Sequence, residues 1–192
     1  MRDRISMVVF VLVLGSILTS ALVAVDYYTA PLIRKNEALK TKMRVLDALG
    51  IPYTEESIEK EFSENVKADS VKWAKFYIST DGNIAFEMAG SGLWGPISGI
   101  LALSSDLETI RGISIIHQEE TPGLGGRIAE RDFLDRFRGK KITPELKIVK
   151  PGKASANNEV DGITGATSSS KAFESIINSQ SKEYISLFRG GG

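Results

Sequence analysis

The chain has 192 residues, and its 24 lysine and arginine residues balance 24 aspartate and glutamate residues. We expect no nucleic-acid partner, because a protein that binds nucleic acid normally carries a basic excess. With one histidine and no cysteine, the sequence excludes disulfides, thiolate nucleophiles, iron–sulfur clusters and multi-histidine metal sites, so we predict no metal centre.

An uncharged segment of 21 residues, 5–25, follows four N-terminal residues. As a helix it would span about 30 Å, the hydrocarbon thickness of a bilayer. Tyr27 and Tyr28 follow where an interfacial aromatic belt would lie. We therefore predict a transmembrane helix over 5–25 after a short segment, 1–4. The alternatives are a cleaved signal peptide, whose apolar part is usually shorter, and a buried core helix.

The charges beside this segment do not fix its orientation. Arg2 and Arg4 favour a cytoplasmic N-terminus under the positive-inside rule, but five basic residues follow between positions 34 and 44. Long C-terminal domains cross the membrane largely regardless of such charges. Charge alone therefore leaves the topology open.

The next segment, 26–50, has leucine and methionine at helical spacing among charged residues, which predicts an amphipathic stalk helix. Gly50 and Pro52 are typical of a helix end. A second helix is predicted over 55–66, where the charged side chains would lie on a solvated face.

The remainder of the chain mixes strand and helix patterns. Residues 71–79 and 83–88 alternate apolar and polar side chains around Asp81-Gly82-Asn83, a strong hairpin signal. We also predict strands over 99–103, 110–117 and 146–150, and helices over 129–137 and 168–187. The segments predict a single α+β domain over 51–192, an antiparallel sheet with helices.

Three glycine-rich segments, 90–97, 117–127 and 161–170, are not explained by helix or strand formation. Glycine lets a backbone come close to a flat or phosphorylated ligand. The third segment leads into a helix predicted to begin near 167–169, and free N–H groups at a helix N-terminus favour a phosphate. The alternative is an ordinary capped helix. A Walker A loop and a G-x-S-x-G nucleophile elbow are both absent, which disfavours nucleotide hydrolysis and serine hydrolase chemistry.

The same three segments resemble the motifs of the FMN-binding domain family. Thr164-Gly165-Ala166-Thr167, preceded by Asp161-Gly162, is similar to its flavinylation motif. The segment 120–125 (ETPGLG) and the segment 90–95 (GSGLWG) resemble two further segments of that family, and they occur in the same order.

The resemblance implies a cofactor and a site. In this family a flavin transferase links FMN through its phosphate to the last threonine of the motif, so Thr167 would carry one covalent FMN per chain. The other expected cofactor-binding residues are Thr164, Gly165, Ala166, Ser168, Glu120, Thr121, Gly123, Leu124, Gly125, Gly92, Leu93 and Trp94. Leu124 and Trp94 would cover the ring, and Glu120 and Thr121 would bond its edge. The alternative for Leu124 and Trp94 is core packing, and His117 is interpreted as structural rather than as a flavin contact.

The resemblance also implies a function. Family members with a single membrane anchor are electron-transfer subunits of ion-translocating complexes, either the Rnf ferredoxin:NAD oxidoreductase or the sodium-translocating NADH:quinone reductase, and the short chain favours the Rnf type. We therefore expect a redox subunit with no catalytic residue of its own, other membrane subunits as partners, and the bilayer around 5–25. The flavin domain would lie outside the cytoplasmic membrane and the N-terminus inside. The alternative is a membrane-anchored flavin-binding sensor or assembly protein.

Overall fold

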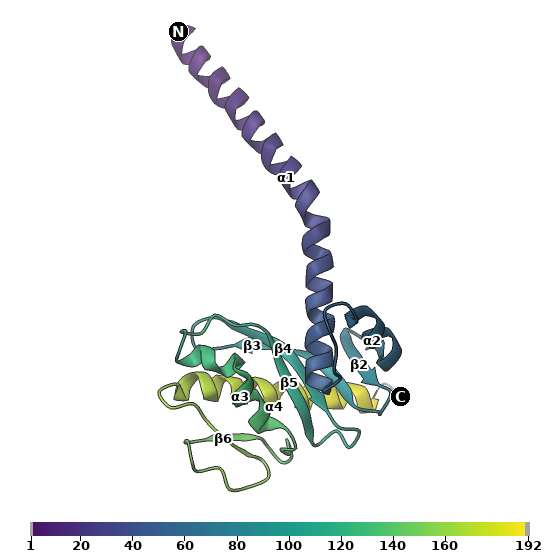
Figure 1. Cartoon of the computed structure of the whole chain (residues 1–192). Coiled ribbons are helices and arrows are strands. Elements are labelled where there is room, and N and C mark those ends of the chain that lie inside the picture. The colour runs from purple at the N-terminus through teal and green to yellow at the C-terminus, as the bar shows by residue number, and fades with distance from the viewer. Residues whose placement is uncertain (1, 191–192) are drawn as a thin grey trace. The chain divides into compact units, whose positions relative to one another are not determined.

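The computed structural model describes residues 2–190 of the chain (Figure 1). Met1, in the predicted segment 1–4, and residues 191–192, at the end of the predicted domain, lie outside the described residues. The chain divides into two compact units, Met1–Leu39 and Lys40–Gly192. The second unit therefore begins inside the segment expected to form the stalk.

The first unit is helical and belongs to α1 (Arg2–Leu49). The part of the chain that the structure describes has one helix long and apolar enough to cross a membrane, Arg4–Leu49, and none of its most apolar window is buried. That exposure excludes the core-helix alternative and fits a single-pass membrane anchor. Ser16 donates its hydroxyl to the Leu12 carbonyl at 2.8 Å, which satisfies this polar group inside the apolar segment.

The second unit contains a five-stranded antiparallel sheet whose spatial order follows the sequence. Its strands are β1 (Val66–Val71), β2 (Ala74–Ser79), β3 (Ile84–Ser91), β4 (Pro96–Leu103) and β5 (Ile110–His117). The predicted hairpin is confirmed, because β2 pairs with β3 and Gly82 has a φ of +78° in the turn between them. The helix α2 (Ile58–Asn65) precedes the sheet.

The polypeptide after the sheet forms short elements and one long helix. They are η1 (Gly125–Ala129), α3 (Arg131–Leu134), η2 (Asp135–Phe137), β6 (Lys147–Val149), β7 (Glu159–Asp161) and α4 (Thr167–Gly190). The strands β6 and β7 form a separate parallel pair. The predicted α+β class with an antiparallel main sheet is confirmed.

The main core lies between the sheet and α4, which crosses one sheet face beside β3 (Figure 1). Phe86 on β3 stacks on Tyr184 of α4 with ring centroids 4.4 Å apart and an interplanar angle of 12°. Phe76 on β2 meets the same tyrosine edge-on at 5.6 Å. These aromatic contacts join the C-terminal helix to the centre of the sheet.

The end of α1 is part of the second unit. Val45, Leu46, Ala48 and Leu49 are buried there. A Cβ on Gly112 of β5 would lie 2.4 Å from the Ala48 carbonyl oxygen, so glycine allows the helix end to pack directly on the strand. The predicted stop is confirmed: the helix ends at Leu49, and Gly50 has a φ of +75°.

Two local predictions were wrong. The strand predicted over 71–79 is interrupted by a turn at Lys72 and Trp73, and β1 pairs back onto β2 across that turn. The helix predicted over 129–137 is instead the end of η1 followed by one short turn of α-helix and a second 3-10 turn. Its apolar residues, Phe133, Leu134 and Phe137, are nevertheless buried as the helical spacing required.

The stacking of Phe86 on Tyr184 predicts a large loss of stability on truncation. Phe86→Ala should lower the free energy of unfolding by about 3–5 kcal/mol, because a large buried ring is replaced by a cavity. Trp94→Ala is the control, since this aromatic side chain is 71% exposed. Urea unfolding of the full chain in mild detergent measures both variants. Equal losses in the two would contradict the assignment of the core.

Candidate functional site

The three glycine-rich segments meet at one cavity of about 280 Å³. Its ten lining residues are Leu93, Trp94, Thr121, Leu124, Gly125, Gly165, Ala166, Thr167, Ser168 and Ser169. The segments are separated by up to about seventy positions in sequence. The cavity therefore brings together nine of the thirteen predicted site residues and adds Ser169, which the sequence did not single out.

The carboxylate of Glu120 joins the three segments. Its Oε1 accepts hydrogen bonds from the backbone N–H groups of Leu93 at 2.6 Å and Trp94 at 3.1 Å. Its Oε2 accepts a hydrogen bond from the Ser169 hydroxyl at 2.6 Å. Glu120 is only 3% exposed, so both oxygens face protein donors rather than the cavity. Glu120 thus acts as a support beneath the site.

Two predicted glycines are required by this buried carboxylate. A Cβ on Gly92 would lie 2.4 Å from Glu120 Oε1, and a Cβ on Gly125 would lie 2.6 Å from Oε2 and 2.4 Å from Ser169 Oγ. No side chain fits at either position without displacing the carboxylate or the serine. Gly92 contributes a tight turn, because its N–H donates to the Gly95 carbonyl at 2.8 Å.

The third segment places exposed hydroxyls at the beginning of a long helix. Gly165 has a φ of +80°, and α4 begins two residues later at Thr167. Ala166, Ser169 and Ser170 are buried, whereas Thr164, Thr167 and Ser168 are exposed. The first N–H groups of any helix lack intrahelical partners and give its N-terminus a positive potential. Thr167 is therefore accessible to another protein and lies where a phosphate is favoured.

The parallel pair β6–β7 holds the start of this segment. Gly162 N–H donates to the Val149 carbonyl at 2.8 Å. Asp161 Oδ1 accepts from the N–H groups of Ala154 at 3.0 Å and Lys153 at 2.9 Å. These backbone hydrogen bonds, that of Ala154 foremost, hold the pKa of Asp161 below its ordinary value. The aspartate before the motif thus fixes the neighbouring turn and points away from the cavity lining.

The apolar residues of the cavity are exposed rather than packed in the core. Trp94 is 71% exposed, Leu93 is 52% exposed and Leu124 is 47% exposed. The core-packing alternative for Trp94 and Leu124 is therefore wrong. Large exposed apolar side chains beside a cavity are typical of a surface that covers a ligand or a partner.

The second segment is a turn built on the Thr121 carbonyl. That oxygen accepts from the N–H groups of Leu124 at 3.1 Å and Gly126 at 2.9 Å. Gly123, with a φ of +73°, lies between Thr121 and Leu124 and is absent from the cavity lining, as are Gly92, Glu120 and Thr164. His117 is also outside the lining and pairs with Glu119 at 3.1 Å. In residues 2–190, no cluster of His, Cys, Asp and Glu could hold a metal ion.

Comparison with known proteins shows what this region of the chain is similar to. Residues 92–180 match the sequence profile of the FMN-binding domain. The C subunit of the Na⁺-translocating NADH-quinone reductase from Haemophilus ducreyi is 35% identical over 113 residues, covering 54% of this chain and 44% of that protein. The corresponding Pseudomonas aeruginosa protein is 32% identical over 115 residues, with the same two coverages. The matched region thus spans less than half the length of these relatives.

Solved structures agree with the fold. The crystal structure of the C subunit of the Na⁺-translocating NADH-quinone reductase from Parabacteroides distasonis is 29% identical, with a TM-score of 0.71, and the match covers 81% of this chain and 94% of that one. Shewanella oneidensis NqrC is 20% identical with a TM-score of 0.66, over 71% of this chain and 88% of that one, and shows the fold alone. The resemblance stated from the sequence motifs is confirmed.

The hydrogen bonds of Glu120 predict which substitutions damage the site. Glu120→Ala should destabilise the chain by about 1–3 kcal/mol, because three donors lose their acceptor. Glu120→Gln should lose less, since its amide still accepts from the backbone and can donate to Ser169 Oγ. The matched control is Glu119→Ala, a neighbouring carboxylate that is 55% exposed, with an expected change within about 0.5 kcal/mol. Thermal unfolding of the full chain compares the three, and an equal loss for both alanine variants would contradict the supporting role of Glu120.

Proposed function

We propose that this chain, whose residues 92–180 match the FMN-binding domain family, is a membrane-anchored electron-transfer subunit that carries one FMN on Thr167. The observation that carries the proposal is the position of Thr167. It is exposed, it is the first residue of α4, and it lines a cavity to which all three glycine-rich segments contribute.

The residues of the cavity fit FMN. The first N–H groups of α4 and the hydroxyls of Thr167 and Ser168 would hold the phosphate. Leu93, Trp94 and Leu124 would cover the ring, and Thr121 would bond its edge. A cavity of about 280 Å³ is at the lower end of small-molecule sites, which are usually about 300–1,000 Å³. Part of the cofactor would therefore remain outside, as an electron carrier that reaches its partners requires.

The lining also fits the chemistry of a carrier. FMN, when bound, accepts and donates electrons, and the protein supplies position and surroundings. None of the ten lining residues is charged or carries an imidazole, so the cavity offers no general acid or base to a substrate. Lys171, the basic residue nearest in sequence to Thr167, is paired with Glu174 at 2.8 Å. The helix N-terminus is then the main partner of the phosphate.

The remaining site residues would act beneath the cofactor. Glu120, Gly92 and Gly125 would hold the three segments in register, and Gly123, Thr164, Gly165 and Ala166 would shape the two loops at the cavity. A covalent phosphoester keeps a partly exposed cofactor from dissociating. It requires a flavin transferase that can reach the Thr167 hydroxyl.

Membrane anchoring and membership of a complex extend the proposal. Residues 5–25 would span the membrane, 26–50 would form the stalk, and 51–192 would carry the flavin outside the cytoplasm, with 1–4 inside. We assign the chain to an ion-translocating oxidoreductase complex of the Rnf type, as expected from the sequence. The sodium-translocating NADH-quinone reductase, for which the relatives are named, is the alternative complex.

Covalent attachment is tested at one hydroxyl. The full chain, produced together with a flavin transferase, should show flavin fluorescence on a denaturing gel and a mass increase of one FMN. Thr167→Ala should abolish both signals, whereas Thr167→Ser and the matched control Ser168→Ala should keep them. Absence of flavin from the wild-type chain would refute the covalent link. Loss in Ser168→Ala with retention in Thr167→Ala would show that the link is not on Thr167.

Purification from native membranes tests the complex. The chain should co-purify with multi-span membrane subunits, and the cofactors of those subunits would separate the Rnf type from the quinone reductase. A chain that carries flavin but purifies alone would contradict the role in a complex and favour the sensor alternative. Protease protection in sealed vesicles gives the side on which 51–192 lies.

A further inference from the structure

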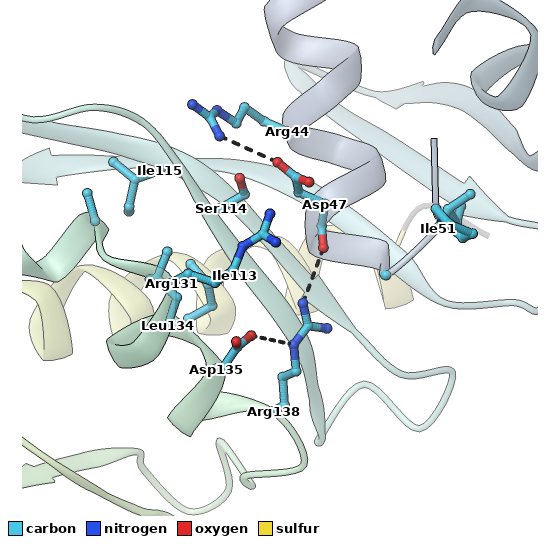
Figure 2. A pocket seen from close by; sticks show the side chains of 13 residues that line it. Arg44, Asp47, Ile51, Ile113, Ser114, Ile115, Arg131, Leu134, Asp135 and Arg138 are labelled. Carbon is cyan, nitrogen blue, oxygen red and sulfur yellow. Dashed lines mark hydrogen bonds and ion pairs between the residues drawn. The ribbon is translucent and has the colours of Figure 1, made fainter. Parts of the chain in front are cut away.

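A second cavity, of about 430 Å³, lies where the end of α1 meets β5 and α3 (Figure 2). It belongs to the unit Lys40–Gly192 and shares no lining residue with the cavity at Thr167. Its wall is apolar at Ile113, Ile115 and Leu134 and is charged at three arginines and two aspartates. A cavity of this size is within the range of small-molecule sites.

In one of the three arginines, each guanidinium nitrogen donates a hydrogen bond within the protein. Arg138 donates Nε to Asp135 Oδ1 at 2.9 Å, Nη1 to the Arg111 carbonyl at 2.9 Å and Nη2 to the Asp47 carbonyl at 3.4 Å (Figure 2). This side chain therefore joins η2, β5 and the end of α1. Its role is explained by structure alone.

The other two arginines are not explained in this way. Arg44 makes one long contact, from Nη1 to Asp47 Oδ2 at 3.4 Å, and its buried Nε has no acceptor among the described residues. Arg131 is exposed to solvent, and Figure 2 shows its side chain among those that line the cavity, where its guanidinium is accessible to a ligand. Guanidinium groups in protein cavities normally find carboxylate or phosphate partners.

The two aspartates do not compensate all of this positive charge. Asp135 is paired with Arg138. Asp47 accepts from Arg44 and also from the Tyr53 hydroxyl at 3.1 Å. Three guanidinium charges against two carboxylate charges leave the lining with one positive charge in excess. The two aspartates accept from Arg44 and Arg138, so the excess charge is at the exposed Arg131.

A buried hydroxyl adds a polar group to the same wall. Ser114 on β5 is 4% exposed and lines the cavity (Figure 2). Because the cavity reaches this side chain, its hydroxyl can donate a hydrogen bond to a ligand there.

We propose that this cavity binds a carboxylate group carried on a short apolar body. Arg131 would pair with the carboxylate, the Ser114 hydroxyl would donate to one of its oxygens, and the isoleucine and leucine side chains would contact the apolar part. One excess positive charge matches a carboxylate, whereas a phosphate monoester carries a charge of about −1.5 to −2 at pH 7 and would be undercompensated beside Asp47 and Asp135. The carboxylate belongs either to a free small acid or to the C-terminus of a partner chain.

Calorimetric titration of the full chain in mild detergent tests the proposal with two probes. The first is butyrate, with butyramide as its uncharged control. The second is N-acetyl-Ala-Val-Ala with a free C-terminus, with the C-terminal amide as its control. We expect dissociation constants of about 0.1–10 mM for a carboxylate of this size, with no binding of either amide. Butyrate binding alone assigns the site to free acids, and tighter binding of the peptide assigns it to a partner's C-terminus.

Variants locate the site. Arg131→Gln should weaken binding by about tenfold or more, and Arg131→Lys should lose less, because it keeps the charge but not the fork of donors. Arg189→Gln removes an exposed arginine of α4 outside the cavity and should leave binding unchanged. Failure of both carboxylates to bind, or equal binding by Arg131→Gln and wild type, would overturn the proposal. The same titration is repeated with Thr167→Ala, which would carry no covalent flavin. Unchanged binding in this variant shows that the result does not depend on flavin attachment.

Discussion

The buried carboxylate of Glu120 is the interaction on which the proposed flavin site depends. It accepts two backbone N–H groups from the turn after β3 and one hydroxyl from α4. A carboxylate taken out of water costs several kcal/mol unless its lone pairs are satisfied, whereas charge-assisted hydrogen bonds are about twice as strong as neutral ones. The three segments are therefore held together by one group, and loss of either donor segment would leave part of the carboxylate without partners. Glycine at positions 92 and 125 follows from the same constraint, because a Cβ at either would displace the carboxylate.

This arrangement separates charge from the surface that receives the cofactor. The charge of Glu120 is enclosed beneath the cavity, and the lining itself has only backbone, hydroxyl and apolar groups. A neutral lining leaves the positive end of α4 as the main electrostatic feature near Thr167, which favours a phosphate. Leu93, Trp94 and Leu124 are exposed around the cavity. The turns that carry them are held by hydrogen bonds to Glu120 and to the Thr121 carbonyl, and not by burial of these three side chains.

Features with a local physical cause were predictable from the sequence. The turn at Gly82 and the stop at Gly50 both need a positive φ, and both were found where glycine indicated them. The strand predicted over 110–117 coincides with β5, and the helix predicted over 168–187 lies within α4. Each is marked by a long periodic pattern or by a residue with few conformational choices.

Features that rest on distant contacts were not predictable. The strand β1 reads as polar (VKADSV) because it is the sheet edge, and its hairpin to β2 turns at Lys72 and Trp73 without glycine or asparagine. The chain from 129 to 137 has helical spacing, yet it forms short turns that follow the packing of Phe133 and Phe137 against Phe173. The role of Glu120 depends on a serine 49 positions away. Sequence resemblance therefore identified Glu120 as a candidate site residue, and only the fold shows that it is buried and absent from the cavity lining.

The two cavities are neighbours along the chain, since Gly125 and Ala129 of one 3-10 helix line different ones. A ligand in the arginine-lined cavity could change the flavin site only if this stretch had two arrangements with different affinities for that ligand. At Gly125 the backbone lies against Glu120 Oε2 and Ser169 Oγ so closely that a methyl group would not fit, and the Gly126 N–H is held by the Thr121 carbonyl at 2.9 Å. Both contacts resist movement of the stretch toward the flavin cavity. Arg131 is exposed on α3, beyond this held turn. A ligand paired with it is therefore expected to leave the support of Thr167 in place.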